Sequence, residues 1–253
     1  MIPHAAQIAT VIEFTHRATT GIAFLSVVVM TLWAYRAHRH NLVWPAAAAS
    51  LGLIITEALL GAGLVLFKYT GSDMSAGRVV YLSAHLVNTL LMLAVMALTA
   101  WWASGHDSPS WSASSGRVLV AAIVGAVAIG VTGTITALGD TLFPVHSLRD
   151  GLQADFAAAS PLILKLRIFH PVVALAAGAL IIMMAWRLDE SSRLRSIVIC
   201  LVSIELSAGL LNLALLTPIW MQLLHLLLGD LLWIALVLLT AAALERRQIA
   251  APV

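Results

Sequence analysis

The sequence predicts an all-α protein: a polytopic membrane helix bundle of seven spans, arranged as two pseudo-symmetric halves of three and four helices. Three observations support this prediction. First, the 253 residues are 61% hydrophobic and only 10% charged, with a mean hydropathy of +0.98, which is more apolar surface than one soluble core can bury. Second, the chain holds seven apolar stretches of about 20 residues or more, the length that crosses a bilayer. Third, a pattern of histidine and glutamate occurs twice.

Each apolar stretch must be a helix, because backbone groups inside the bilayer have no water to bond. The first ends before Arg36, and the second begins at Trp44. The fourth is rich in small residues, the fifth ends at Trp186 and the last begins at Trp220. Tryptophans at span ends are typical interfacial anchors. The predicted spans are 9–35, 44–67, 79–102, 117–138, 161–186, 196–216 and 220–244.

Basic residues near the span ends predict the orientation. We place the N-terminus outside and the C-terminus in the cytoplasm of a bacterial inner membrane, because the inner side collects more of these residues. The net charge of +2, with no basic run, speaks against a nucleic-acid partner. The inner side holds Arg36, Arg39, Arg117, Arg187, Arg193, Arg195, Arg246 and Arg247, and the outer side holds Lys68, Arg78, Arg149, Lys165 and Arg167.

Two longer connections divide the chain. Residues 104–116 are polar and rich in serine and proline, so we interpret them as a cytoplasmic linker between an N-terminal half, 1–103, and a C-terminal four-helix half, 117–253. Residues 139–160 form an outer loop, in which we expect a short surface helix over the mouth of the bundle.

The repeated pattern is histidine, then Glu-x-x-x-Gly, then histidine, each on a separate span. Both copies run in the same direction through the membrane, which indicates a parallel repeat. In the second half one extra span, 117–138, precedes the pattern. The first copy is His16, Glu57, Gly61 and His85, and the second is His170, Glu205, Gly209 and His225.

All four histidines lie in the outer half of spans that run from outside to inside, so they share one layer of the membrane. Two imidazoles at matched depth on neighbouring helices supply both axial ligands of a haem iron. A tetrahedral metal site favours clustered ligands and usually includes a cysteine or carboxylate. The alternative is that each histidine only makes a hydrogen bond between helices.

Glu13 is the second informative residue. It lies three residues before His16 and four before Arg17, so the three share a helix face. The carboxylate either pairs with Arg17 at the interface or takes part in chemistry beside His16, and only the first half has a carboxylate at this position. We expect Glu57 and Glu205 to be buried, protonated hydrogen-bonding groups. Gly61 and Gly209 allow close approach of a helix or a porphyrin.

These motifs together resemble the heme A synthase family. The matching features are Glu13-x-x-His16-Arg17 at the start of a span, His85 in an Ala-His-Leu span, the repeated Glu-x-x-x-Gly, His170, and His225 in Leu-Leu-His-Leu-Leu-Leu-Gly-Asp. The resemblance implies an eight-helix protein that oxidises the C8 methyl of heme O to the formyl of heme A for cytochrome oxidase assembly. It implies that His16 and His85 flank the substrate heme O with Arg17 beside them, that Glu13 is the catalytic carboxylate, and that His170 and His225 bind a cofactor haem, heme b.

The family normally has a further span before Glu-x-x-His-Arg, which this sequence lacks. We expect that the start is assigned too far downstream, because the span 117–138 has no partner in the first half. The implied partners are heme O, a heme O synthase, an electron donor protein, the lipid bilayer and a second copy in a homo-oligomer. Two other functions stay open: a di-haem b-type electron-transfer protein, and a non-catalytic haem-handling assembly protein.

Overall fold

The computed structural model describes residues 5–109, 113–187 and 193–249, and this part of the chain is built from helices. Seven of them are long and apolar enough to cross a membrane, so the predicted class and number of spans are confirmed. The protein is a multi-pass membrane protein. The helices are α1 (Ala5–Ala37), α2 (Val43–Leu66), α3 (Ala76–Ala103), α4 (Ala113–Leu142), α5 (Leu148–Phe156), α6 (Leu162–Arg167), α7 (Phe169–Arg187), α8 (Arg193–Ala214) and α9 (Ile219–Ile249).

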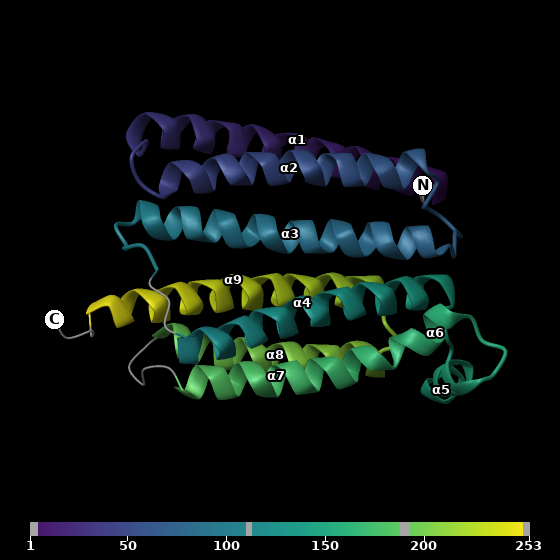
Figure 1. Cartoon of the computed structure of the whole chain (residues 1–253). Helices are drawn as coiled ribbons and strands as arrows, with labels where there is room; N and C mark the ends of the chain where they lie inside the picture. Colours follow the sequence, from purple (N-terminus) through teal and green to yellow (C-terminus); the bar gives the residue numbers. More distant parts are fainter. Residues whose placement is uncertain (1–4, 110–112, 188–192, 250–253) are drawn as a thin grey trace.

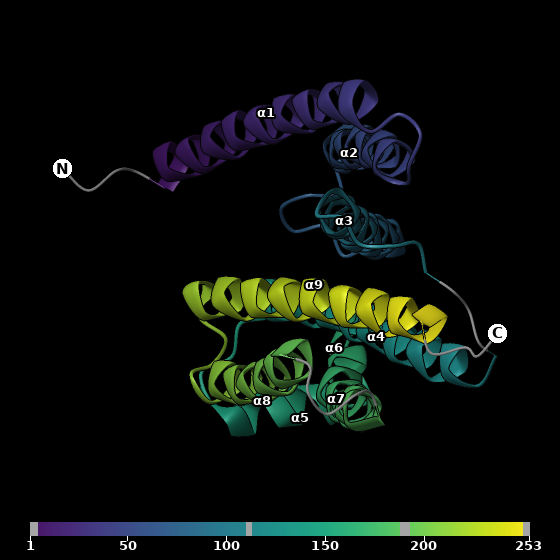
Figure 2. The ribbon, with the colours of Figure 1, turned by 90° about the vertical axis from the view of Figure 1, so that its left-hand side faces the viewer.

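The long helices run side by side along one axis, as Figure 1 shows. Helix α2 packs between α1 and α3, and α3 packs against α9 and α4 of the remaining group. Figure 2 shows this division, with α1 to α3 on one side and α4 to α9 on the other. A polar contact crosses the boundary within the helices: the indole Nε1 of Trp233 donates a hydrogen bond of 2.7 Å to the carbonyl of Leu90.

The larger core lies among the helices of the C-terminal group. Its most deeply buried side chains include Ile181, Met184, Val198 and Leu236, and Leu90 of α3 joins them. The second cluster is much smaller and holds Ala34, Val43 and Ala47 of α1 and α2, where small residues let the two helices approach closely. The apolar packing is therefore concentrated in the C-terminal group.

The predicted span 161–186 is confirmed as the membrane-length segment Leu162–Arg187, but its helix is interrupted. The structure has α6 and α7 separated at Ile168. Pro171 explains the break, because proline has no N–H to donate to the carbonyl four residues earlier and its ring crowds that carbonyl. That carbonyl belongs to Arg167, and the hydroxyl of Thr136 on α4 donates to it instead, at 3.4 Å.

The connections also differ from the prediction in one respect. Helix α4 begins at Ala113, so the linker is shorter than the predicted 104–116. Its first residues are tied to the end of α9: the His106 ring stacks on Trp101 with centroids 3.5 Å apart, and its Nδ1 lies 3.1 Å from Glu245 Oε2. The expected surface helix is confirmed as α5, which Figure 1 shows lying across the end of the bundle beside α6.

Candidate haem-binding site

The structure brings two of the four repeat histidines together. His170 of α7 and His225 of α9 have ring centroids 6.3 Å apart and ring planes inclined at 70°. A bond from imidazole nitrogen to a transition metal is about 2 Å long. Two such bonds on opposite sides of one iron, together with the ring radii, give a centroid separation of about 6 Å. The spacing of this pair therefore suits the axial ligands of one haem.

Two residues of helix α4, Thr132 and Gly133, contact the His170 ring. A Cβ on Gly133 would lie only 3.0 Å from His170 Cε1, so the glycine makes room for the ring. The Thr132 hydroxyl lies 3.2 Å from His170 Nδ1 and also 2.8 Å from the carbonyl of Ala128. Because the hydroxyl proton goes to a backbone carbonyl, its oxygen is free to accept a proton from Nδ1. This assigns the tautomer in which Nε2 keeps its lone pair for a metal.

Helix α8 holds His225 in a similar way. Glu205 Oε1 lies 3.1 Å from His225 Nδ1, although the ring N–H is not aligned for a hydrogen bond in this structure. A Cβ on Gly209 would lie 3.2 Å from His225 Cε1. The predicted close approach at Gly209 thus involves the imidazole itself. Glu205 Oε2 is buried and has no hydrogen-bond partner in the described part of the chain.

His85 in the N-terminal half has a matching carboxylate. Its Nδ1 lies 2.8 Å from Glu57 Oε1 on α2, again outside hydrogen-bond alignment. Asn88 Nδ2 donates to Glu57 Oε2 at 2.7 Å, and the hydroxyl of Thr89 contacts Glu57 Oε1. Glu57 is therefore half-buried and accepts hydrogen bonds from α3, and the histidine of the repeat lies beside it. The predicted protonation of Glu57 stays a prediction. A Cβ on Gly61 would meet His85 Nε2 at 3.8 Å, an ordinary contact.

His16 is in a different environment. It is exposed on α1, which packs chiefly on α2, and the structure records no contact between His16 and His85. Glu13 and Arg17 form an ion pair of 2.6 Å on the same helix, with side chains 63% and 71% exposed. The interfacial pairing of Glu13 with Arg17 that the sequence allowed is thus present. The predicted roles of Glu13, His16 and Arg17 in substrate binding stay predictions.

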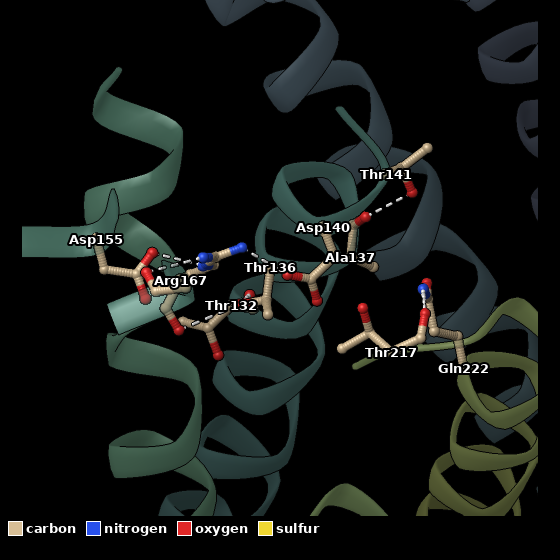
Figure 3. A network of polar contacts seen from close by, with 10 residues as sticks. Thr132, Thr136, Ala137, Asp140, Thr141, Asp155, Arg167, Thr217 and Gln222 are labelled. Carbon is tan, nitrogen blue, oxygen red and sulfur yellow. Dashed lines mark hydrogen bonds and ion pairs between the residues drawn. The ribbon is translucent and has the colours of Figure 1, made fainter. Parts of the chain in front are cut away.

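An ionic cluster lies where α5 and α6 meet the end of α4, and Figure 3 shows its residues. Arg167 donates from Nε to Asp155 Oδ1 at 2.6 Å, from Nη1 to Asp140 Oδ1 at 2.9 Å, and from Nη2 to the carbonyl of Gly151 at 3.3 Å. It thereby ties α5 and α6 to the end of α4. Burial raises the pKa of the Asp155 carboxyl, and the adjacent guanidinium opposes part of this shift.

Sequence reasoning missed this cluster and the contacts of His170. Arg167 enters the prediction only as a basic residue near a span end that indicates orientation. It lies within a predicted span, however, and an ionisable residue inside a span indicates a buried partner. The sequence around Thr132 and Gly133 showed only small residues suited to close helix packing. In the described residues, no group of three or more histidine, cysteine, aspartate or glutamate side chains is arranged to hold a metal ion.

The chain is similar to one family of known proteins and to several individual ones. The chain matches the COX15-CtaA family, described as "Cytochrome oxidase assembly protein", over residues 3–237. It is 42% identical over 258 aligned residues to a "Protoheme IX farnesyltransferase" of Thermus thermophilus, with 97% of this chain and 42% of that protein covered. This chain thus spans less than half the length of that relative. No solved structure is significantly similar to this chain.

Shorter stretches match proteins named "Heme A synthase". The identity is 35% over 68 residues with the protein of Alkalihalophilus pseudofirmus, covering 26% of this chain and 23% of that one. It is 39% over 71 residues with the protein of Shouchella clausii, with the same coverage. Because the family match extends over nearly the whole chain, from the first helix to the middle of α9, this protein belongs to the COX15-CtaA family, the heme A synthase family.

Proposed function

We propose that this protein is a heme A synthase-like oxidoreductase, which converts the C8 methyl of heme O to the formyl of heme A for cytochrome oxidase assembly. The observation that carries the proposal is the pair of imidazoles on α7 and α9, 6.3 Å apart within a chain of this family. Such a pair suits a haem protein. The conversion proceeds by two successive hydroxylations of the methyl. Each takes up O2, two electrons from the donor protein and two protons, places one oxygen atom on the carbon and releases the other as water. The geminal diol formed in the second step loses water to give the formyl.

The C-terminal half holds the cofactor in this proposal. His170 and His225 would hold heme b, while Gly133 and Gly209 leave room for their rings. Thr132 and Glu205 occupy the Nδ1 sides of the two imidazoles, so that both Nε2 atoms remain available. When bound, this haem would supply one-electron redox chemistry.

The N-terminal half holds the substrate. His85 would bind heme O, since Glu57 holds it as Glu205 holds His225. His16 would provide the opposite ligand from α1, with Arg17 beside it. Glu13 would accept a proton from the reacting methyl or stabilise positive charge that develops there. In the present structure Glu13 pairs with Arg17 instead, so substrate binding must separate this pair.

The partners follow from the same chemistry. The Thermus relative is named for farnesyl transfer to protoheme IX, and a farnesylated haem is the substrate proposed here. We therefore propose a heme O synthase as the protein that delivers the substrate. An electron donor protein and a second copy of the chain complete the proposed partners. We also propose that the C-terminus lies in the cytoplasm and the histidine layer near the outer face of the bacterial cell membrane, and the arginine-rich loops support this orientation.

One observation favours a second candidate, a b-type electron-transfer protein or a haem-handling assembly protein. Only the C-terminal pair of imidazoles is brought together, while His16 and Glu13 are exposed. A carrier needs haem ligands but not the carboxylate of Glu13.

The deciding experiment is to express the full chain with a heme O synthase in a host that makes no heme A, and to measure the mass of the extracted haems. We expect the hydroxylated or formyl product, and its loss in Glu13→Gln. Glu245→Gln, which changes a carboxylate at the opposite end of the bundle, is the matched control and should retain the product. Unchanged heme O with a reversible haem redox spectrum would instead support the carrier. If the chain instead forms a farnesylated haem from protoheme IX and farnesyl diphosphate without the synthase, it catalyses the reaction for which the Thermus relative is named.

A further inference from the structure

We propose that Glu57 and Glu205 are positioning residues for the haem ligands that follow them: each carboxylate holds the Nδ1 side of one imidazole, so that Nε2 faces the iron. This inference rests on the haem ligation in the proposed function, but not on the oxidation of heme O. It assigns one role to the same position of both repeats.

The geometry is the same in both halves. Each glutamate lies on the helix between the two histidine-bearing helices of its half, and its carboxylate reaches Nδ1 of the later histidine, at 2.8 Å for His85 and 3.1 Å for His225. The glycine four residues after each glutamate lies beside the same imidazole, with a Cβ distance of 3.8 Å at Gly61 and 3.2 Å at Gly209. Carboxylate and glycine thus contact one ring from one helix.

The surroundings of the carboxylates support a directed role. An ionisable side chain within a span is costly, so it persists where it has a specific partner. For Glu205, the structure records no donor at Oε2 in the described residues, and His225 is the partner at Oε1. A Cβ on Gly229, one turn after His225, would lie 3.1 Å from this same Oε1. The C-terminal helix therefore leaves space for the carboxylate beside the imidazole.

A carboxylate in this position has two effects on a metal ligand. It fixes the tautomer and the orientation of the ring, and it makes the coordinating nitrogen a stronger donor. Loss of such a partner typically weakens metal binding by about 10- to 100-fold. Asn88 and Thr89 fix the position of the Glu57 carboxylate through hydrogen bonds. In the described residues no donor contacts Glu205 Oε2. We therefore expect the orientation of the His225 ring to depend on the Glu205 carboxylate without further polar contacts.

The test uses the full chain in detergent with haemin as the probe. The variants are Glu205→Gln, which keeps an acceptor for the Nδ1 proton but removes the charge, and Glu205→Ala, which removes both. Glu245→Gln is the matched control, because Glu245 also pairs with a histidine, His106, but at the inner end of α9. Haemin affinity, the low-spin electron paramagnetic resonance spectrum and the midpoint potential are measured for each.

We expect Glu205→Ala to bind haemin about 10- to 100-fold more weakly and to broaden or split the low-spin signal as the His225 ring loses its fixed orientation. Glu205→Gln should restore most of the affinity and the sharp signal but shift the midpoint potential upward, since a neutral amide stabilises ferric iron less. A merely structural glutamate would change yield or thermal stability without this upward shift. Wild-type affinity, signal and potential in both Glu205 variants would overturn the inference. Heme O turnover is not among the readouts, so a chain that ligates haem in this way but does not oxidise heme O refutes only the proposed function.

Discussion

In the C-terminal half, His170 and His225 stand with ring centroids 6.3 Å apart, each with a polar partner at Nδ1 and a glycine beside its ring. In the N-terminal half, His85 has the equivalent carboxylate, but His16 is exposed on α1. The difference comes from the neighbouring helix. Helix α4 packs on α7 and supplies Thr132 and Gly133 to His170, whereas α1 packs chiefly on α2. A repeated motif thus places the same ligands in both halves, and packing decides which ligands meet.

The largest expected effect separates the two halves by haem content. His225→Ala removes a member of the assembled pair, so the full chain loaded with haemin should lose the low-spin absorbance of that site. His85→Ala should retain it, because His85 belongs to the other half. His146→Ala, in the outer loop, is the control. Haem content per chain and the Soret band are the measurements. Retention of the full low-spin band in His225→Ala would show that this pair is not the haem site.

An arginine stabilises the junction of α4, α5 and α6 in the C-terminal half, and another stabilises the α2–α3 connection in the N-terminal half, through different contacts. Arg167 binds two buried carboxylates, so Arg167→Met leaves them uncompensated and should cost about 3–5 kcal/mol of stability. Arg78, in the first turn of α3, donates to the carbonyls of Gly71 and Asp73 in the α2–α3 loop, and Arg78→Met should cost only about 1 kcal/mol. Thermal unfolding in detergent measures both.

Replacing Asp140 and Asp155 by asparagine in the Arg167→Met background should recover part of the lost stability, because the uncompensated charges are then absent. Equal losses in Arg167→Met and Arg78→Met would contradict the difference between the two arginines.

The repeat glycines provide a finer comparison. In Gly209→Ala the new Cβ lies 3.2 Å from His225 and forces the ring to shift, whereas in Gly61→Ala it meets His85 at 3.8 Å without strain. Alanine favours the helix equally at both positions. We expect haemin affinity of the C-terminal site to fall by about 1 kcal/mol, roughly fivefold, in Gly209→Ala. Gly61→Ala should leave it unchanged, and a similar loss in both would indicate a general effect on helix packing.

The smallest expected effect concerns the stability contribution of Glu13. Its ion pair with Arg17 is largely exposed, so Glu13→Gln should change the free energy of unfolding by no more than about 0.5 kcal/mol. The measurement is thermal unfolding of Glu13→Gln, compared with that of Arg167→Met under the same conditions. A loss comparable to that of Arg167→Met would mean that Glu13 is buried against a partner, and that the N-terminal half is more closed than this structure shows.

Several features could be predicted from particular residues. The break between α6 and α7 follows from Pro171, although the apolar pattern alone suggested one helix. The surface helix α5 was expected from the polar outer loop. The ends of α4 were less predictable, because its first residues, from Ala113, are polar and resemble a linker while its last turn reaches Leu142.

The candidate site was predictable in its ligands but not in its contacts. His170 and His225 stood out because they recur in the repeat, and they do meet. Thr132 and Gly133 could not be identified as neighbours of His170, nor Asn88 and Thr89 as partners of Glu57. Threonine, asparagine and glycine serve general helix packing in most membrane spans. Arg167 was visible in the sequence, but its two carboxylate partners lie 27 and 12 residues away on other helices.

The sequence by itself determined the seven helices and the histidine that four of the spans carry, because bilayer thickness sets the length of an apolar span and the absence of water makes it helical. Only the tertiary structure decided which side chains face one another. An apolar helix in lipid has no strongly preferred rotation about its axis, so its rotation is set by packing against its neighbours. This is why α4 could seat His170 while the same motif on α1 left His16 exposed.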